Sequence, residues 1–277
     1  PKNTGLVSIL HPWESGYDNS PLWDYSMKEV KVEKNLEYKR GDNKVINPEY
    51  RPLDSDYDRY VTIKNHLRKN KYNPKKLYNK SMFNVVDVGF NSIFLRANKD
   101  LSELLKSFNL EHNKLKKFIL KSENQIEKLY NVKKGVFTNY DIRNKKKIIV
   151  PSITNYFILF ADLKNQTINK KIIKNLKNHN QTKKYIFSSI KPNHKKFEEK
   201  RYWRGPVWIN CNWIIYQGLK NKDKNFANKI KEKTINLIKK NGFFEYYSFK
   251  TGKAFGASNF SWTASLFLDL VMEKKYN

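Results

Sequence analysis

The sequence has a single cysteine, Cys211, among its 277 residues. One thiol forms no internal disulfide, so the sequence implies no oxidising compartment. Cys211 lies within the apolar run VWINCNWII, which predicts a small packed residue rather than a nucleophile. The sequence also lacks an apolar run of the roughly 18 residues that a membrane span needs, and no signal peptide opens it. We therefore expect a cytoplasmic protein without a membrane partner.

Arginine is scarce, although the formal net charge is +29. The basic residues are mostly lysines, spread along the chain and mixed with asparagines, as in IKNHLRKNKYNPKKLYNK (63–80). Residues 3–27 and 205–219 contain neither Lys nor Arg. Because base-edge readout favours Arg, this diffuse charge indicates solvated helix faces encoded by an AT-rich genome. We expect no nucleic-acid partner, and a basic nucleic-acid-binding protein is kept as a remote alternative.

Helical periodicity dominates the rest of the chain. Apolar residues recur at helical spacing over 55–70, 87–108, 112–130, 152–163, 167–178, 206–220, 223–240 and 258–274. Either Asp54 or Ser55 can cap the first of these helices. In contrast, GVFTNYDIRNKKKIIVP (135–151) alternates apolar residues about a polar turn, which predicts a β-hairpin. No internal linker or repeat interrupts this pattern. It predicts one all-α domain, built from helix pairs, over residues 1–277.

The first unusual segment is HPWESGYDNSPLWD (11–24), where Asp18 stands among aromatic residues. Ser20 and Pro21 are typical of a helix start, so Asp18 is expected at a loop-to-helix junction. An aspartate at that place often serves only as a cap. However, neighbouring aromatic rings both stack on sugar faces and desolvate a carboxyl group, which raises its pKa. We therefore interpret Asp18 as a general acid, with aromatic neighbours at Trp13, Tyr17 and Trp23.

The second segment is RYWRGPVWINCNW (201–213), which carries three tryptophans around an Arg-Gly-Pro turn. A tryptophan at helical spacing is usually a core residue, and we accept that interpretation for Trp213. The residues that flank the turn itself are instead predicted to form a pocket wall. They are Tyr202, Trp203 and Trp208.

The third segment, GFFEYYSFKTGKAFGASNFSWTA (242–264), places Glu245 among four aromatic residues. A buried carboxylate is costly unless it is hydrogen-bonded or used in chemistry. The glycines at 252 and 256 predict a tight loop, followed by a helix capped near Ser258. Two carboxylates on aromatic-lined loops, Asp18 and Glu245, are the groups that glycoside hydrolysis requires.

The segments HPWESGYDNSP, RPLDSDYDRY, YWRGPVWIN and FFEYYSFKTG with FGASNFSWTA occur in this order between residues 5 and about 271. They resemble the signature segments of the mannosylglycerate and glucosylglycerate hydrolases, a branch of glycoside hydrolase family 63 that is distantly similar to the trehalases. The resemblance implies an (α/α)6 barrel and an inverting mechanism. It also implies that Asp18 is the general acid and Glu245 the general base. Sugar-contacting positions are matched by Trp13, Tyr202, Trp203 and Trp208, and Arg204 is matched to a structural or carboxylate-orienting arginine. Tyr17, beside Asp18, is a further candidate for substrate binding because of its aromatic ring.

The sequence departs from this family in two places. Family members carry a substantial helical segment before the first motif, so we expect an N-terminally incomplete chain that forms the C-terminal two thirds of the barrel. The segment DVGFNSIF (87–94) has Val-Gly where Asp-Pro is expected, which alters only a helix start. Neither departure touches the two carboxylates.

The favoured hypothesis is therefore an inverting glycosidase that cleaves a small α-glycoside such as mannosylglycerate or glucosylglycerate. The first alternative is a trehalase or an oligosaccharide-trimming α-glucosidase, and the second is an inactive sugar-binding module. We expect neither a cofactor nor a bound metal. The sequence does not indicate which sugar is cleaved or how many copies of the chain associate.

Overall fold

The computed structural model describes residues 4–179 and 186–273, and amphipathic helices account for most of this part of the chain. The α-helices are α1 (Asp24–Lys28), α2 (Asp54–Lys69), α3 (Pro74–Lys80), α4 (Val88–Ser107), α5 (Asn113–Glu127), α6 (Ile158–Ala161), α7 (Gln166–His179), α8 (Ile209–Leu219), α9 (Lys224–Asn241) and α10 (Ser261–Met272). Short 3-10 helices are η1 (Pro12–Ser15), η2 (Asp42–Lys44), η3 (Pro48–Tyr50), η4 (Ile153–Tyr156) and η5 (Tyr202–Arg204). The predicted all-α class is confirmed.

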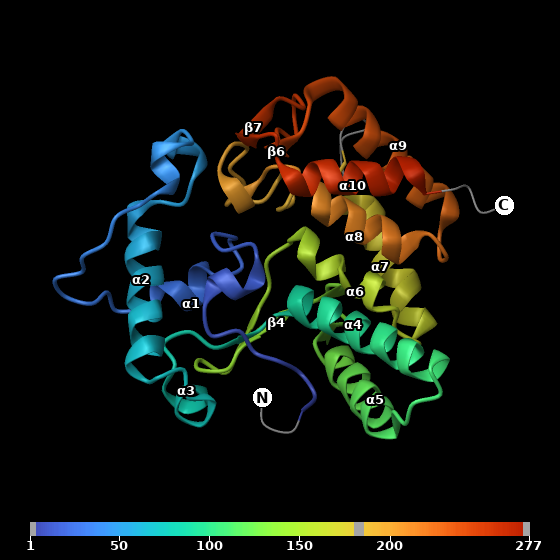
Figure 1. Cartoon of the computed structure of the whole chain (residues 1–277), viewed down its shortest axis with the longest axis horizontal. Helices are drawn as coiled ribbons and strands as arrows, with labels where there is room; N and C mark the ends of the chain where they lie inside the picture. The colour runs from blue at the N-terminus through green and yellow to red at the C-terminus, as the bar shows by residue number, and fades with distance from the viewer. Residues whose placement is uncertain (1–3, 180–185, 274–277) are drawn as a thin grey trace.

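Helices α4 to α10 are grouped on one side of the molecule, whereas α2 and α3 lie apart from them (Figure 1). α4 packs against its partner α5 and also against α6, and α6 packs against α8. α8 then contacts both α9 and α10, which contact each other. Helices α4, α6, α8 and α10 thus form a row in which each is the neighbour of the next. This is the helix-pair arrangement of an (α/α)6 barrel, as the sequence predicts.

The close approach of α6 to α8 depends on a glycine. A Cβ atom on Gly218 would lie 2.6 Å from the backbone nitrogen of Phe160 and 2.7 Å from the carbonyl carbon of Leu159. No side chain fits at these distances, so glycine lets the two helices meet backbone to backbone. The neighbouring Leu159 and Ile215 are fully buried in the core that results.

Small antiparallel sheets connect the helices. The predicted hairpin is confirmed as β4 (Asn139–Asp141) and β5 (Lys146–Ile148), with β1 (Val85–Val86) added on the other side of β4. β2 (Tyr130–Asn131) pairs with β3 (Val136–Phe137). The segment interpreted as a loop at 242–264 contains a further hairpin, β6 (Phe244–Tyr247) and β7 (Ala254–Ser258), with an irregularity in register between Phe244 and Tyr246.

Three predicted helix starts are wrong by a few residues. The helix expected at Ser20 and Pro21 begins at Asp24, because residues 19–22 form turns instead. α2 is capped by Leu53 rather than by Asp54 or Ser55, and the Asp56 carboxylate accepts a hydrogen bond from the Leu53 N–H (3.1 Å). α10 is capped by Phe260 and not near Ser258, since β7 extends to that residue.

Apolar side chains are exposed on the two outer members of the helix row. On α4 they lie at helical spacing at Ile93, Leu101 and Leu104, and on α10 they are Trp262, Leu268, Val271 and Met272. Cys211 is buried, as predicted. Within residues 4–179 and 186–273, the longest helices are too short or too polar to cross a bilayer.

Candidate active site

The loop that carries Asp18 is anchored to α2. The Nδ1 atom of His11 accepts a hydrogen bond from the Trp13 N–H (3.0 Å), which caps η1. The Nε2 atom of His11 contacts the Tyr60 carbonyl oxygen on α2 at 2.9 Å. Burial lowers the pKa of His11 to about 4, so the neutral ring accepts at Nδ1 and donates at Nε2. These two bonds fix the chain just before Asp18.

Asp18 lies half-buried where this loop approaches α2. The Tyr60 hydroxyl donates a hydrogen bond to the Asp18 carbonyl oxygen (3.0 Å). Burial raises the pKa of the Asp18 carboxyl group to about 6; the charge of Arg51 opposes this rise, and the charge of Glu245 adds to it. Asp18 therefore holds a proton to nearly neutral pH, which is the environment predicted for a general acid.

Glu245 lies on β6 with only 6% of its surface exposed. Its Oε2 atom accepts a hydrogen bond from the Ala257 N–H on β7 (3.1 Å). Gly256 makes this arrangement possible, because its φ is +74° and a Cβ atom there would lie 2.4 Å from Glu245 Oε2. The β6–β7 hairpin, which sequence reasoning missed, is therefore the element that orients this carboxylate.

Arg51 binds Glu245 and was not identified from the sequence. Its Nη1 atom donates to Glu245 Oε1 (3.2 Å) and Oε2 (3.3 Å), and its Nε atom donates to Asp42 Oδ2 (3.3 Å). The guanidinium lies 4.1 Å from the centre of the Tyr202 ring, in a cation–π contact. Two features of the sequence could have pointed to Arg51: its place in RPLDSDYDRY and the scarcity of Arg. The ion pair itself leaves no local pattern, because its two residues are distant in sequence.

Tyr202 lies at the centre of these groups. Burial and the charges of Asp18 and Glu245 raise the pKa of its hydroxyl, and the Arg51 charge opposes the rise. Its backbone φ is +37°, a strained value for a non-glycine residue, and such strain is concentrated at functional sites. The structure thus brings Asp18, Glu245 and Tyr202 together, although they come from three distant segments.

The two tryptophans of the predicted pocket wall pack against the ring of Tyr202. Trp203 and Trp208 stack with their ring centres 3.6 Å apart, and each is only 2% exposed. Trp208 also stacks on Tyr246 of β6 at 5.0 Å. This buried stack joins the 201–208 segment to the strand of Glu245. A sugar contact by either indole stays a prediction.

The other predicted aromatic contacts differ in exposure. Trp13 is 43% exposed and rests against His11 and Tyr60, so its indole is open to a ligand. Tyr17 is buried, stacks on Trp23, and donates its hydroxyl hydrogen bond to Asp87 at the start of α4. The structure gives Tyr17 core contacts, and its contact with substrate stays a prediction, as for Trp203 and Trp208.

Arg204 cross-links two parts of the site. Its guanidinium forms a bidentate pair with Asp24 on α1, at 2.9 and 3.1 Å, and its Nε atom donates to Glu198 Oε1 (2.6 Å). Its Nη1 atom also donates to the carbonyl oxygen of Asn19 (3.2 Å). These contacts occupy the guanidinium, which favours the structural role considered for it over direct binding of a sugar.

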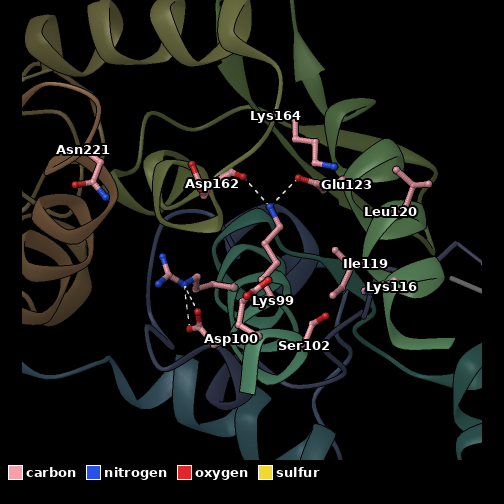
Figure 2. A pocket seen from close by; sticks show the side chains of 12 residues that line it. Lys99, Asp100, Ser102, Lys116, Ile119, Leu120, Glu123, Asp162, Lys164 and Asn221 are labelled. Atoms are coloured by element: carbon pink, nitrogen blue, oxygen red, sulfur yellow. Dashed lines mark hydrogen bonds and ion pairs between the residues drawn. The ribbon is translucent and has the colours of Figure 1, made fainter. Parts of the chain in front are cut away.

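A cavity of 740 Å³ lies away from these residues, between α4, α5 and the residues that follow α6. Lys99 lies among its lining residues, and its Nζ atom binds Glu123 Oε1 (2.7 Å) and the carbonyl oxygen of Asp162 (2.7 Å), as Figure 2 shows. The same Nζ atom also binds the carbonyl oxygen of Ala161 (2.9 Å). These bonds brace three elements and satisfy the lysine. In residues 4–179 and 186–273, His, Cys, Asp and Glu do not gather in groups able to hold a metal ion.

Comparison with known proteins identifies the family of this chain. Residues 1–263 match the family model described as the mannosylglycerate hydrolase MGH1-like glycoside hydrolase domain. The chain is 38% identical over 271 residues to the mannosylglycerate hydrolase of Thermus thermophilus, a match that covers 97% of this chain and 65% of that protein. It is 28% identical over 275 residues to the glucosylglycerate hydrolase of Mycolicibacterium hassiacum, covering 96% of this chain and 62% of that protein.

A solved structure gives the same result for the fold. The crystal structure of the GH63 mannosylglycerate hydrolase from Thermus thermophilus, in complex with Tris and D-glycerate, is similar with a TM-score of 0.93 at 38% identity. The similarity covers 97% of this chain and 65% of the solved one. The chain therefore spans slightly less than two thirds of the length of the relatives that it matches.

Proposed function

Because the chain belongs to the mannosylglycerate hydrolase MGH1-like glycoside hydrolase domain family, we propose that it hydrolyses a small α-glycoside of glycerate with inversion at the anomeric carbon. The observation that carries this proposal is that two carboxyl groups with different electrostatic environments, Asp18 and Glu245, lie near Tyr202. Asp18 is desolvated and holds a proton, whereas Glu245 is paired with Arg51. General acid catalysis needs the first environment, and activation of a water molecule needs the second.

In this mechanism Asp18 donates its proton to the departing glycosidic oxygen. Glu245 removes a proton from a water molecule as that water attacks the anomeric carbon from the opposite face. One proton enters the leaving group and one leaves the nucleophile, so hydrolysis is balanced. Trp13 and Tyr202 are the aromatic side chains placed to contact the sugar ring.

The names of the relatives favour an anionic leaving group over a neutral one. Arg51 does not decide this, because its guanidinium is shared between the carboxylates of Glu245 and Asp42, and Glu245 acts on the sugar face opposite to the leaving group. A glycerate leaving group carries a carboxylate, whereas trehalose carries no charge. The named substrates of the relatives, mannosylglycerate and glucosylglycerate, both carry that carboxylate.

The same proposal includes the architecture of the complete enzyme. The 277 residues would form the C-terminal two thirds of an (α/α)6 barrel, and preceding helices would cover the exposed apolar residues of α4 and α10. Two observations support this: those residues lie at the two outer members of the helix row, and the relatives are longer than this chain. Apolar helix faces in water otherwise favour association.

Hydrolysis assays on four glycosides test the function. The chain, alone and joined behind the preceding segment of the Thermus thermophilus relative, is incubated with mannosylglycerate, glucosylglycerate, trehalose and kojibiose. Cleavage of a glycerate glycoside with little cleavage of the disaccharides is the expected result. Preference for trehalose or kojibiose would replace the proposal with the trehalase or α-glucosidase alternative. Binding without cleavage by both proteins would favour a sugar-binding module.

A further inference from the structure

A second cavity lies next to Asp18 and is distinct from the surroundings of Glu245. Its volume is 250 Å³, and it opens between the 18–28 segment and α2. Asp18 and Asn19 line it from the loop, and Asp56, Arg59 and Tyr60 line it from the helix. Arg51, Tyr202 and Glu245 are not among its lining residues. Asp18 therefore borders the candidate reaction site and also a separate polar space.

Two hydrogen-bond donors in this lining have no partner among the residues that the structure describes. The first donor is Nδ2 of Asn19, a residue that is only 4% exposed. The Oδ1 atom of Asn19 does have a partner, because it accepts a hydrogen bond from the Trp203 N–H (3.0 Å). Arg59 donates from Nη1 to the Ser55 carbonyl oxygen (2.6 Å), and its buried Nε atom is the other. Buried donors are normally satisfied by ordered water when protein acceptors are missing. The space is polar and large enough for several water molecules, so we infer that it is hydrated.

Tyr60 stands between the two carboxyl groups that border this cavity. It is 1% exposed, and its hydroxyl donates to the Asp18 carbonyl oxygen. The charges of Asp18 and Asp56 both act on its ring hydroxyl. Asp56 Oδ2 accepts the Leu53 N–H, which leaves Oδ1 as the oxygen able to carry a proton. Asp18 on the loop and Asp56 on the first turn of α2 therefore line the same cavity.

The proposed reaction creates a need for such a route. After each turnover Asp18 has lost a proton to the leaving group, and Glu245 has gained one from water. Before the next turnover Asp18 must regain a proton, and the product sugar in front of it obstructs delivery from that side. A path through the cavity between the 18–28 segment and α2 would supply the proton independently of product release.

We propose that this cavity is a hydrated proton route in which Asp56 takes a proton from solvent and passes it through water to the Asp18 carboxylate. The inference rests on the proposed function of Asp18. The transfer is balanced, because Asp56 is protonated by a hydronium ion, loses that proton to cavity water, and Asp18 receives one from the same water. Asp56 acts through Asp18 and does not touch substrate.

The surroundings of Asp56 suit this exchange. Burial raises the pKa of the Asp56 carboxyl group, and Asp24 on α1 adds to the rise. The Leu53 N–H, Arg204 of η5 and Arg59 of α2 oppose it. Lys28 completes the charged lining from the end of α1. A carboxyl group with a pKa nearer to neutrality binds and releases protons more evenly at physiological pH.

Asp56→Asn tests the route, with Asp54→Asn as the matched control. Both remove one carboxylate from the first turn of α2, but Asp54 is bound to Arg40 (2.7 Å) and does not line the cavity. With the cleaved glycerate glycoside, Asp56→Asn is expected to lower kcat about tenfold above pH 6 and to leave kcat/KM unchanged, because reprotonation of Asp18 follows the irreversible cleavage and becomes limiting. Imidazole buffer should restore kcat, because imidazolium can donate the proton at this pH, and Asp56→Glu should retain it. Equal kcat in both Asn variants, or no rescue by buffer, overturns the proposal.

A second measurement does not depend on activity. Water contacts of the Asn19 side-chain amide are detected by NMR exchange spectroscopy in the 15N-labelled chain, with Asn19→Asp identifying the signal. Exchange cross-peaks with water support a hydrated route, and their absence overturns it. If the wild-type protein cleaves none of the glycosides, the proposed function fails by itself, and this measurement still decides whether the cavity is hydrated.

Discussion

Arg51 and Glu245 are joined by hydrogen bonds of 3.2 and 3.3 Å, although 194 residues separate them in the sequence. Arg51 precedes α2, whereas Glu245 lies on β6 near the end of the chain. Their contact fixes the carboxylate that is proposed to activate water, and it places a positive charge within reach of Asp18. The site therefore depends on how the first quarter of the chain docks against the last.

Replacing Arg51 with Met should move the pH dependence of hydrolysis. The Arg51 charge lowers the pKa of Asp18 below the value that burial alone would give, so its removal raises that pKa above about 6. Asp18 then stays protonated to higher pH, and the alkaline limb of the kcat/KM profile shifts upward while the maximum falls about 100-fold. Arg40→Met is the control, since Arg40 pairs with Asp42 and Asp54 but not with Glu245. An unshifted alkaline limb would contradict the assignment of Asp18.

Asp18→Asn and Glu245→Gln should each abolish turnover and retain sugar binding. Both substitutions keep the shape of the side chain and remove only its proton chemistry, for which losses of about 10²–10⁴-fold or more are typical. For inversion, the two carboxyl groups of the substrate complex should be separated by ~6.5–9.5 Å. Proton NMR of the first product anomer checks the stereochemistry. Release of the anomer present in the substrate would exclude the proposed roles even if both variants were inactive.

Asp18→Asn should also stabilise the protein at neutral pH. A carboxyl group whose pKa rises from 3.8 to about 6 on folding binds protons more tightly in the folded state, so the free energy of unfolding falls as pH rises between these values. The loss reaches up to about 3 kcal/mol above pH 6. The variant should therefore melt at a higher temperature than the wild type at pH 7 and at a similar temperature at pH 4. A difference that did not depend on pH would show that ionisation of Asp18 is not its cause.

Gly256→Ala should disturb Glu245 and destabilise the β6–β7 hairpin. The φ of +74° disfavours a side chain, and the added Cβ atom would meet Glu245 Oε2 at 2.4 Å. We expect a loss of about 1–3 kcal/mol in the free energy of unfolding and a larger fall in kcat than in substrate affinity. Gly41→Ala is the control, because its added Cβ atom meets nothing within 4 Å. Chemical denaturation and steady-state kinetics measure both effects, and equal stability of the two variants would be the contrary result.

The exposed apolar residues of α4 should bind the preceding helices of the proposed barrel. Leu104 on α4 and Leu120 on α5 are exposed to nearly the same extent, 55% and 54%, but only α4 is an outer member of the helix row. Leu104→Glu should therefore abolish binding of the preceding segment of the Thermus thermophilus relative, while Leu120→Glu should not, because a buried charge is costly. Calorimetry with the separate segment measures binding. Equal affinities would place the interface elsewhere.

The sequence alone predicted the elements that depend on local periodicity. The stripe expected at 87–108 is the helix Val88–Ser107, and the hairpin expected within 135–151 is β4 with β5. The aromatic neighbours of Asp18 and Glu245 also marked these two carboxylates before their surroundings were known. Patterns of this kind involve only residues that are close in sequence, since helical spacing and strand alternation repeat within a few residues.

Tertiary structure alone decided the surroundings of the two carboxylates. Glu245 is oriented by Gly256 and Arg51, and the pKa of Asp18 is raised by burial and by the charge of the distant Glu245. Exposure divided aromatic residues that look alike in the sequence: Trp13 is open to solvent, whereas Trp203 and Trp208 are stacked in the core. Burial, ion pairing and pKa depend on which distant segments pack together, and that packing is set by the whole chain rather than by any local pattern.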